Sequence, residues 1–156
     1  MNRSIESFLR FVHLTSSGLL AGSLAFGGSA LFPGWEEELP VERKLEAERT
    51  LKAFNAIGPT ALATAVTLLV GTRRGAGRRR ILDAASAASL AGVLGATLLG
   101  TVPINRKISL ERPPDYPSDE SLSTAKNWAR VHALRTALGV TAFVIAAGAT
   151  VLAKRE

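Results

Sequence analysis

A short stripe of chemically capable side chains stands in the C-terminal third of the chain. Trp128, His132 and Arg135 follow one another at intervals of four and three residues, so an α-helix places them on one face, and Thr136 continues the stripe. Ionisable groups inside an apolar segment are costly and need partners. Arg135 would take its partner from asparagine side chains, backbone carbonyls or a ligand anion. The stripe therefore predicts a polar pocket.

The same residues also allow a purely structural interpretation. Arginine side chains at the end of a membrane span can extend to the lipid headgroups, and tryptophan is common at the interface. In that interpretation Arg130 and Arg135 contact headgroups while Trp128 anchors the helix. His132 favours the pocket, because it shares the face of Arg135.

Four long windows without a charged residue form the frame for this stripe. The windows cover residues 11–35, 53–72, 84–105 and 136–153. A helix needs about 20 apolar residues to cross the hydrocarbon core of a bilayer, and all four windows lie in or at the edge of the usual range. The sequence predicts an all-α, integral membrane four-helix bundle. Its single domain, 1–156, would have spans at about 9–32, 53–72, 82–104 and 131–153.

The connection between the second and third spans predicts the orientation. It contains Arg73, Arg74, Arg78, Arg79 and Arg80. Basic residues beside a span favour the cytoplasmic side, and an even number of crossings then places both termini there, N-in and C-in. We expect helix 2 to extend outward from the membrane over Val41–Leu51. The connection between helices 3 and 4 contains Pro113, Pro114 and Pro117, which exclude a regular helix there.

This topology brings polar residues of three helices to the outer side of the membrane. Asn55 lies near the outer start of span 2, Asn105 and Arg106 end span 3, and His132 lies where span 4 enters. We therefore predict that the pocket is closed by three helices. Its expected substrate-binding residues are Trp128, Asn55, Arg106 and Thr136.

Composition excludes several kinds of site. The chain has no cysteine, so disulfides, thiolate catalysis and cysteine-ligated metal are ruled out. The net charge of +6 does not predict a nucleic-acid partner, because the densest basic run lies in a loop between spans rather than on an exposed domain. His13 and His132 are expected near opposite membrane faces, too far apart to share a metal ion or a haem. We expect no metal site and no cofactor.

The outer ends of spans 3 and 4 resemble a known family. The run Val102-Pro103-Ile104-Asn105, followed by a polar loop and Trp128-x-x-x-His132-x-x-Arg135, is similar to the anthrone-oxygenase-like family of small four-helix membrane proteins. The resemblance is clearest from Leu98 to Phe143. Family members often carry a further tryptophan or arginine just before the motif, where this chain has Ser123, Thr124 and Ala125. That departure leaves the substrate open.

The resemblance implies a reaction and a set of residues. Some members are associated with the oxidation of an anthrone to an anthraquinone by O₂, without an obvious bound cofactor. Carried onto this chain, the pattern makes His132 the general base, since histidine titrates near pH 6.5. Arg135 and Asn105 would stabilise the enolate, and Trp128 would line a slot for a flat ring. The candidate catalytic residues are thus His132, Arg135 and Asn105.

Two other functions remain open beside that of an enzyme. Small residues recur every four positions in span 3, at Ala84, Ala88, Gly92, Ala96 and Gly100. Such a ridge allows close helix packing in lipid. It would also suit an accessory subunit of a larger membrane complex, or a homo-oligomer. A third possibility is a non-catalytic binder of a lipophilic small molecule in the same pocket. In every case we expect a multi-pass protein of the cell membrane with lipids as partners.

Overall fold

The described part of the chain is helical throughout. The computed structural model describes residues 2–27, 56–71, 77–105 and 119–153, and it contains no strand among them. The elements are α1 (Arg3–Phe26), α3 (Ile57–Gly71), α4 (Gly77–Ala96), the π-helix η2 (Thr97–Thr101) and α6 (Asp119–Ala153). The all-α prediction is confirmed for these residues. The expected outward extension of helix 2 and the proline-containing connection lie outside them.

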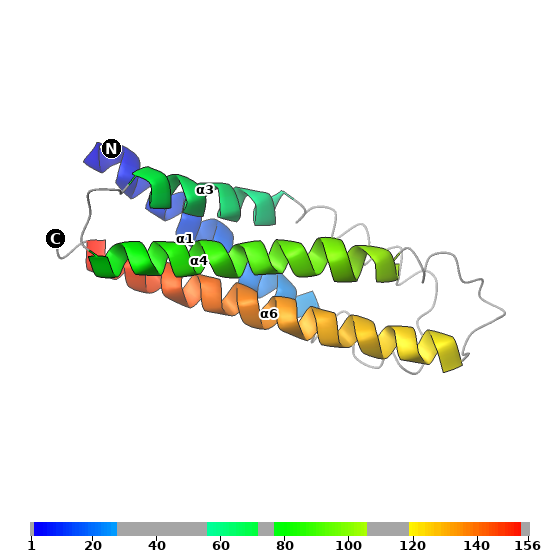
Figure 1. The fold of residues 1–156 in the computed structure, drawn as a ribbon. Coiled ribbons are helices and arrows are strands. Elements are labelled where there is room, and N and C mark those ends of the chain that lie inside the picture. Colours follow the sequence, from blue (N-terminus) through cyan, green and yellow to red (C-terminus); the bar gives the residue numbers. More distant parts are fainter. Residues whose placement is uncertain (1, 28–55, 72–76, 106–118, 154–156) are drawn as a thin grey trace.

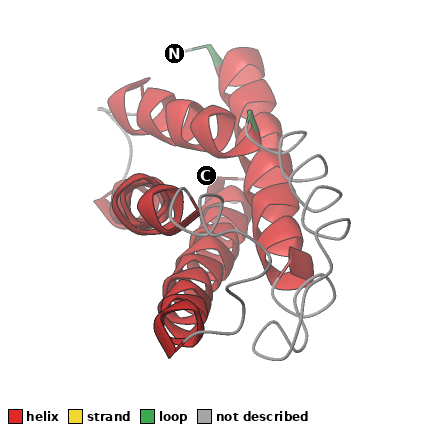
Figure 2. Cartoon of the chain, turned by 90° about the vertical axis from the view of Figure 1, so that its right-hand side faces the viewer, coloured by secondary structure: helices red, strands yellow, loops and turns green. Residues whose placement is uncertain are grey.

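The four helices form an elongated bundle (Figure 1). The start of α1, the end of α3, the start of α4 and the end of α6 lie at one end, which we call the N-terminal end; the opposite end is the distal end. Helix α4 packs against α6 and α3, and α1 packs against α3 and α6. Helices α1 and α4 therefore lie on a diagonal of the bundle, which Figure 2 shows from its distal end.

Local signals in the sequence explain where the first two helices begin. The Asn2 side-chain oxygen accepts a hydrogen bond from the backbone N–H of Ser4 at 3.1 Å, which caps α1. Pro59 lies in the first turn of α3, where a missing N–H breaks no helical bond. The hydroxyls of Thr60 and Thr67 donate to carbonyls of their own helix at 2.8 Å, so α3 can present an apolar surface despite its threonines.

The centre of the bundle is packed with small and branched aliphatic side chains. Its core cluster consists of Leu20, Leu24, Ala61, Ala65, Ala87, Leu90, Val93 and Ala142. Four of these eight residues are alanines, which let the helix backbones approach closely. Dispersion contacts between closely packed helices stabilise such a bundle even where the hydrophobic effect does not operate.

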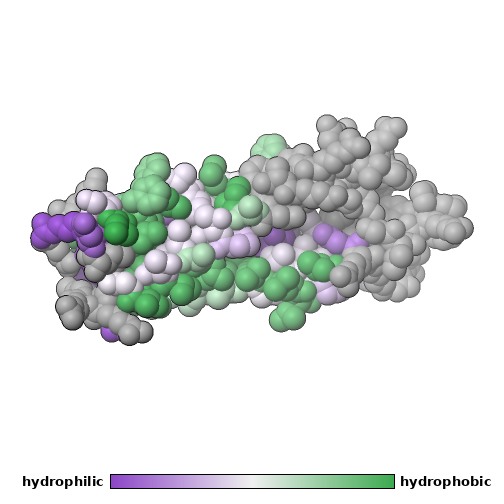
Figure 3. Space-filling view, turned by 90° about the horizontal axis from the view of Figure 1, so that it is seen from above, coloured by the Kyte–Doolittle hydropathy of each residue, from purple (hydrophilic) through white to green (hydrophobic). Residues whose placement is uncertain are grey.

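The distribution of polar and apolar side chains is inverted relative to a water-soluble domain. Arg10, His13, Asp83 and His132 are buried, whereas large apolar side chains are exposed on every described helix. The most exposed of these apolar residues are Phe8, Phe11, Ile81 and Leu99. Figure 3 shows hydrophobic side chains over much of the described part of one face, with hydrophilic ones at the N-terminal end and a few more toward the distal half. Among the described residues, four ionisable side chains therefore lie in the interior, while large apolar side chains lie on the surface.

Two of the described helices are long and apolar enough to cross a membrane. They are Gly77–Asn105, which joins α4, η2 and the following turn, and Lys126–Leu152 within α6. Helix α3 is apolar but has only 15 described residues. The expected first and second spans, about 9–32 and 53–72, extend beyond the described residues.

Glycines allow α6 to pack closely against two neighbours. A Cβ on Gly100 would lie 2.8 Å from Val131, one on Gly92 would lie 3.1 Å from Leu138, and one on Gly18 would lie 3.1 Å from Phe143. By contrast, a Cβ on Gly95 would meet nothing within 4 Å. Within the small-residue ridge, Gly92 and Gly100 therefore form the contact with α6, and Gly100 makes the closest approach.

We expect Gly100→Ala to destabilise the bundle and Gly95→Ala, on the same helical segment, to leave it unchanged or slightly more stable. The added methyl at position 100 meets the stiff β-branched side chain of Val131, and overpacking of this kind costs about 1–3 kcal/mol. At position 95 only the gain in helix propensity remains, about 0.5–1 kcal/mol. Thermal unfolding in detergent followed by circular dichroism measures both. Equal melting temperatures would show that α4 and α6 do not approach as described.

Candidate functional site

A stacked aromatic pair forms the centre of the distal site. Trp128 and His132 lie one turn apart on α6, with ring centroids 4.7 Å apart and planes 5° from parallel. Both side chains are buried, with 5% and 7% of their surface exposed. Stacking and burial together restrict the imidazole to one orientation.

The hydrogen bond of His132 determines which ring nitrogen is basic. Its Nε2 lies 2.9 Å from the backbone carbonyl of Leu24, near the end of α1. A carbonyl oxygen can only accept, so Nε2 carries the proton and donates it. In the neutral imidazole the lone pair is then on Nδ1. The contact between α6 and α1 thus selects Nδ1 as the atom that can take a proton.

Thr101 and Asn105, at the distal end of the helical segment Gly77–Asn105, complete the site. The Trp128 indole Nε1–H donates to Asn105 Oδ1 at 3.0 Å, and Arg135 Nη1 donates to Thr101 Oγ1 at 3.2 Å. Thr101 is the last residue of the π-helix η2, and single π-turns within α-helices often occur at functional sites. The tight approach of Gly100 to α6 brings these donors and acceptors within reach of each other.

The guanidinium of Arg135 is only partly satisfied. Its Nε is buried and has no hydrogen-bond partner, and no carboxylate among the described residues forms an ion pair with this side chain. Partial burial makes an uncompensated charge expensive. An anion that reached this guanidinium would therefore be bound favourably.

The structure brings four of the predicted site residues together. At the distal end Asn105, Trp128 and His132 are joined by direct contacts, and Arg135, on the same face of α6, bonds to Thr101 beside them. The hydroxyl of Thr136 donates to the His132 backbone carbonyl at 3.0 Å, so it bonds within its own helix instead of extending the group. Asn55 and Arg106 lie outside the described residues.

Two members of the distal site were not predicted. Thr101, which accepts from Arg135, precedes Asn105 by four residues, and that spacing on one helical face was the available signal. The carbonyl of Leu24 carries no sequence signal, because every residue has one. Its role follows only from the packing of α1 against α6.

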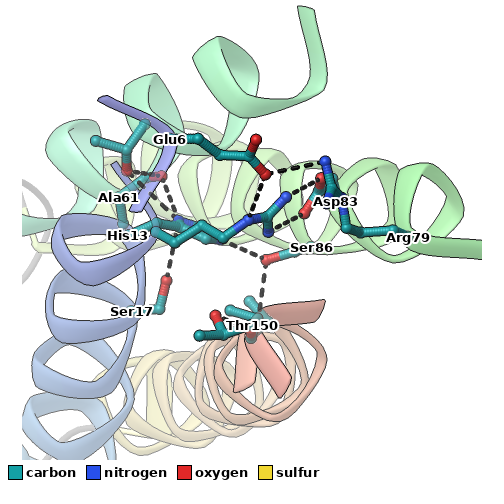
Figure 4. Close-up of polar contacts among 12 residues, drawn as sticks. Glu6, His13, Ser17, Ala61, Arg79, Asp83, Ser86 and Thr150 are labelled. Atoms are coloured by element: carbon teal, nitrogen blue, oxygen red, sulfur yellow. Dashed lines mark hydrogen bonds and ion pairs between the residues drawn. The ribbon is translucent and has the colours of Figure 1, made fainter. Parts of the chain in front are cut away.

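A second polar cluster, which sequence reasoning missed, lies toward the N-terminal end (Figure 4). Arg10 of α1 donates from Nη1 and Nη2 to the two carboxylate oxygens of Asp83 of α4, both at 3.1 Å. Glu6 Oε1 accepts from Arg10 Nε at 3.0 Å and pairs with Arg79 Nη2 at 2.9 Å. Arg10 and Asp83 are 5% and 3% exposed. This charge network crosses the diagonal of the bundle.

Beside that network, His13 forms hydrogen bonds to α3 and α4. Its Nδ1 lies 3.2 Å from the carbonyl of Ala61 in α3, and its Nε2 lies 3.0 Å from Ser86 Oγ in α4. Ser86 Oγ lies in turn 3.2 Å from the carbonyl of Ala142 in α6. One histidine and one serine therefore connect all four helices. Leu24, the partner of His132, lies eleven residues after His13 on α1, which is roughly 16 Å along the helix axis. The two imidazoles therefore lie toward opposite ends of the bundle.

The charge pair had a signal in the sequence. Arg10 and Asp83 each stand immediately before an uncharged window, at residues 11 and 84. If the first and third spans cross the membrane in the same direction, their first residues lie at the same depth. Arg10 and Asp83, each just before its window, then lie at the same depth and carry opposite charges. No such signal marks Ser86.

Among the described residues there is no group of three or more histidine, aspartate or glutamate side chains that could hold a metal ion.

An apolar groove of about 290 Å³ lies on the face formed by α1 and α3. Its walls are Phe11, Val12, Thr15, Ser16, Leu19, Ala56, Ile57 and Thr60. The hydroxyls of Ser16 and Thr60 donate to carbonyls of their own helices, so they offer the groove little polarity. No residue of the distal site lines this groove, and its surface suits contact with hydrocarbon.

The Arg10–Asp83 pair can be tested by removing one or both charges. We expect Arg10→Met and Asp83→Leu each to destabilise the protein by about 3–5 kcal/mol, because each leaves a buried charge without its partner. The double variant should recover much of the loss, since no charge of the pair is then left. Arg80→Met, which removes an exposed arginine of the same helix, is the control. Additive losses in the double variant, measured by unfolding in detergent, would contradict a coupled pair.

Comparison with known proteins places these observations in a family. A family model described as anthrone oxygenase matches residues 49–145, which include α3, α4, η2 and most of α6. No curated protein and no solved structure matches the chain. The match contains every side chain of the distal site and confirms the resemblance seen in the C-terminal half. It also extends it toward the N-terminus, and the chain belongs to the anthrone oxygenase family.

Proposed function

We propose that the chain is a multi-pass protein of the cell membrane whose four helices each cross the bilayer, with both termini in the cytoplasm. The inverted distribution of polar and apolar side chains supports this, because apolar residues exposed on all four helices would face lipid. The apolar length of α4 and α6 supports it as well. Arg78 and Arg80 are exposed at the N-terminal end, where the cytoplasmic headgroups would lie.

We further propose that the distal site oxidises a lipophilic anthrone-like ketone with O₂ and without a cofactor. The observation that carries this proposal is the placement of a tautomer-fixed imidazole beside a guanidinium that has no counter-ion among the described residues. A weakly acidic C–H next to a carbonyl needs a base for the proton and a cation for the oxygen that becomes negative. His132 and Arg135 supply these two functions on one face of α6.

His132, Arg135, the substrate and O₂ are sufficient to balance the reaction. His132 Nδ1 removes a proton from the ring CH₂ opposite the ketone, and the electron pair moves into the enolate, whose oxygen is stabilised by Arg135 Nε. The electron-rich carbon then adds O₂, and the resulting peroxide takes the proton back from His132. Loss of the second C–H proton with cleavage of the O–O bond gives a new C=O and one molecule of water. The substrate is oxidised by four electrons, and O₂ accepts all four.

Each remaining residue of the distal site has a positioning role in this scheme. The Trp128 ring holds the imidazole by stacking, and Asn105 fixes the indole through its Nε1–H. Thr101 occupies Nη1 of Arg135, which leaves Nε to face the developing charge. Burial strengthens these electrostatic contacts, because the surroundings have a low dielectric constant.

We expect His132→Gln to reduce the rate of anthrone-dependent O₂ consumption by about 10²–10⁴-fold, because glutamine can still donate to the Leu24 carbonyl but cannot act as a base. Arg135→Met should cost about 10²–10³-fold through loss of enolate stabilisation. The exposed Arg130 of the same helix provides the matched control, and Arg130→Met should keep the wild-type rate. Rates are measured in detergent and corrected for uncatalysed oxidation of the anthrone.

The outcome also separates the competing functions. Folded variants at positions 132 and 135 that keep the full rate would rule out this mechanism. Wild-type protein that binds an anthrone but does not accelerate O₂ consumption would instead be a binder of a lipophilic molecule. Stable co-purification with a larger membrane complex, with no affinity for an anthrone, would identify an accessory subunit.

A further inference from the structure

We propose that His13 is a proton-binding site, in which the Ser86 hydroxyl allows the imidazole to take up a second proton without losing a hydrogen bond. This site belongs to the N-terminal half of the bundle and is independent of the chemistry proposed for the distal end. It rests on the directions that its hydrogen bonds must have. Those directions follow from the chemistry of the partners.

In the neutral state one tautomer of His13 pairs both ring nitrogens; the Ser17 hydroxyl, 3.5 Å from Nδ1, is a more distant neighbour. The Ala61 carbonyl can only accept, so the proton of the neutral ring is on Nδ1, 3.2 Å away. Nε2 then carries the lone pair and must accept from Ser86 Oγ at 3.0 Å. The single hydroxyl proton of Ser86 therefore points to the imidazole in this state.

The protonated state is satisfied after one rotation. With a proton on Nε2, the ring becomes the donor and Ser86 Oγ the acceptor over the same 3.0 Å. The hydroxyl proton is released to turn toward the Ala142 carbonyl, 3.2 Å from Oγ. Rotation about the Cβ–Oγ bond of Ser86 is the only movement that this exchange requires. Both protonation states thus keep both ring nitrogens paired.

Burial makes this pairing decisive. His13 is 4% exposed and Ser86 is fully buried, so solvent does not replace a missing partner. An unpaired buried donor destabilises the folded state, and more so when it is charged. In most buried settings one of the two states of an imidazole would carry that cost. Here the serine removes it from both.

The charged groups around His13 are balanced in sign, so the network adds no net positive charge that would oppose protonation of the imidazole. Glu6 and Arg10 of α1 and Arg79 and Asp83 of α4 are joined in the ion-pair network, two of each sign. The described contacts of His13 to α3 are uncharged, namely the Ala61 carbonyl and the Thr64 hydroxyl, the latter 3.4 Å from Nδ1. On α6 the Ala142 carbonyl is reached through Ser86. Burial of the ring is the largest effect and disfavours the imidazolium, the neighbouring Asp83 carboxylate attracts it, and Arg10 repels it.

Nitrogen NMR of the full chain tests the site directly. With ¹⁵N-labelled histidine in detergent micelles, the two imidazoles are assigned by the loss of one signal set in His132→Gln. We expect His13 to carry its proton on Nδ1 at about pH 8 and to gain a second on Nε2 on acidification to about pH 4.5, while the backbone amide spectrum stays dispersed. A ring that keeps one proton throughout, a neutral ring with its proton on Nε2, or uptake that coincides with unfolding would each overturn the proposal.

A pair of serine variants tests the role of the hydroxyl. In Ser86→Ala the imidazolium has no acceptor for Nε2–H, so the melting temperature should fall on acidification by about 5 °C more than in the wild type. Ser89→Ala is the matched control, because the Ser89 hydroxyl donates to Ala85 of its own helix. It should follow the wild type, including any effect of acid on the ion-pair network. If Ser86→Ala and Ser89→Ala respond alike to pH, the hydroxyl has no such role.

Discussion

The bundle depends on one constraint: ionisable side chains in its interior need hydrogen-bond partners, and other helices supply most of them. Arg10 reaches Asp83 across the diagonal, and His132 reaches a carbonyl of α1. Such bonds do more than satisfy individual groups. Because each has a direction and a fixed length, together they set the register of helices whose apolar contacts alone would allow sliding. An interior of alanine and leucine is less specific in this respect.

The polar groups are collected in two layers with an apolar layer between them. The N-terminal layer contains the ion-pair network and His13, and the distal layer contains the Trp128–His132 stack. Leu20, Leu90 and Val93 belong to the core cluster between them. This separation allows different tasks at the two ends. The N-terminal layer holds its charges in ion pairs and stabilises the fold, whereas the distal layer retains a guanidinium without an ion pair among the described residues.

The distal site also illustrates how packing creates reactivity. A histidine or an arginine near the end of an apolar helix is not by itself evidence of reactivity, because both side chains can place their polar tips in water. What distinguishes His132 is that α1 supplies a carbonyl to one nitrogen and Trp128 holds the ring, so that the other nitrogen is the basic one. What distinguishes Arg135 is the lack of a carboxylate among the described residues near it. Membership of the anthrone oxygenase family gives these features a chemical context.

The amino-acid sequence by itself determined the helical class and the face shared by Trp128, His132 and Arg135, because helical periodicity is a local property of the chain. It also contained the run that identified the family. Only the tertiary structure decided the partners: the Leu24 carbonyl for His132, Thr101 for Arg135, and Asp83 for Arg10. A backbone carbonyl has no signature in the sequence, and a cross-helix pair depends on rotation and depth that local pattern does not specify. The protonation chemistry of both histidines is therefore a consequence of packing.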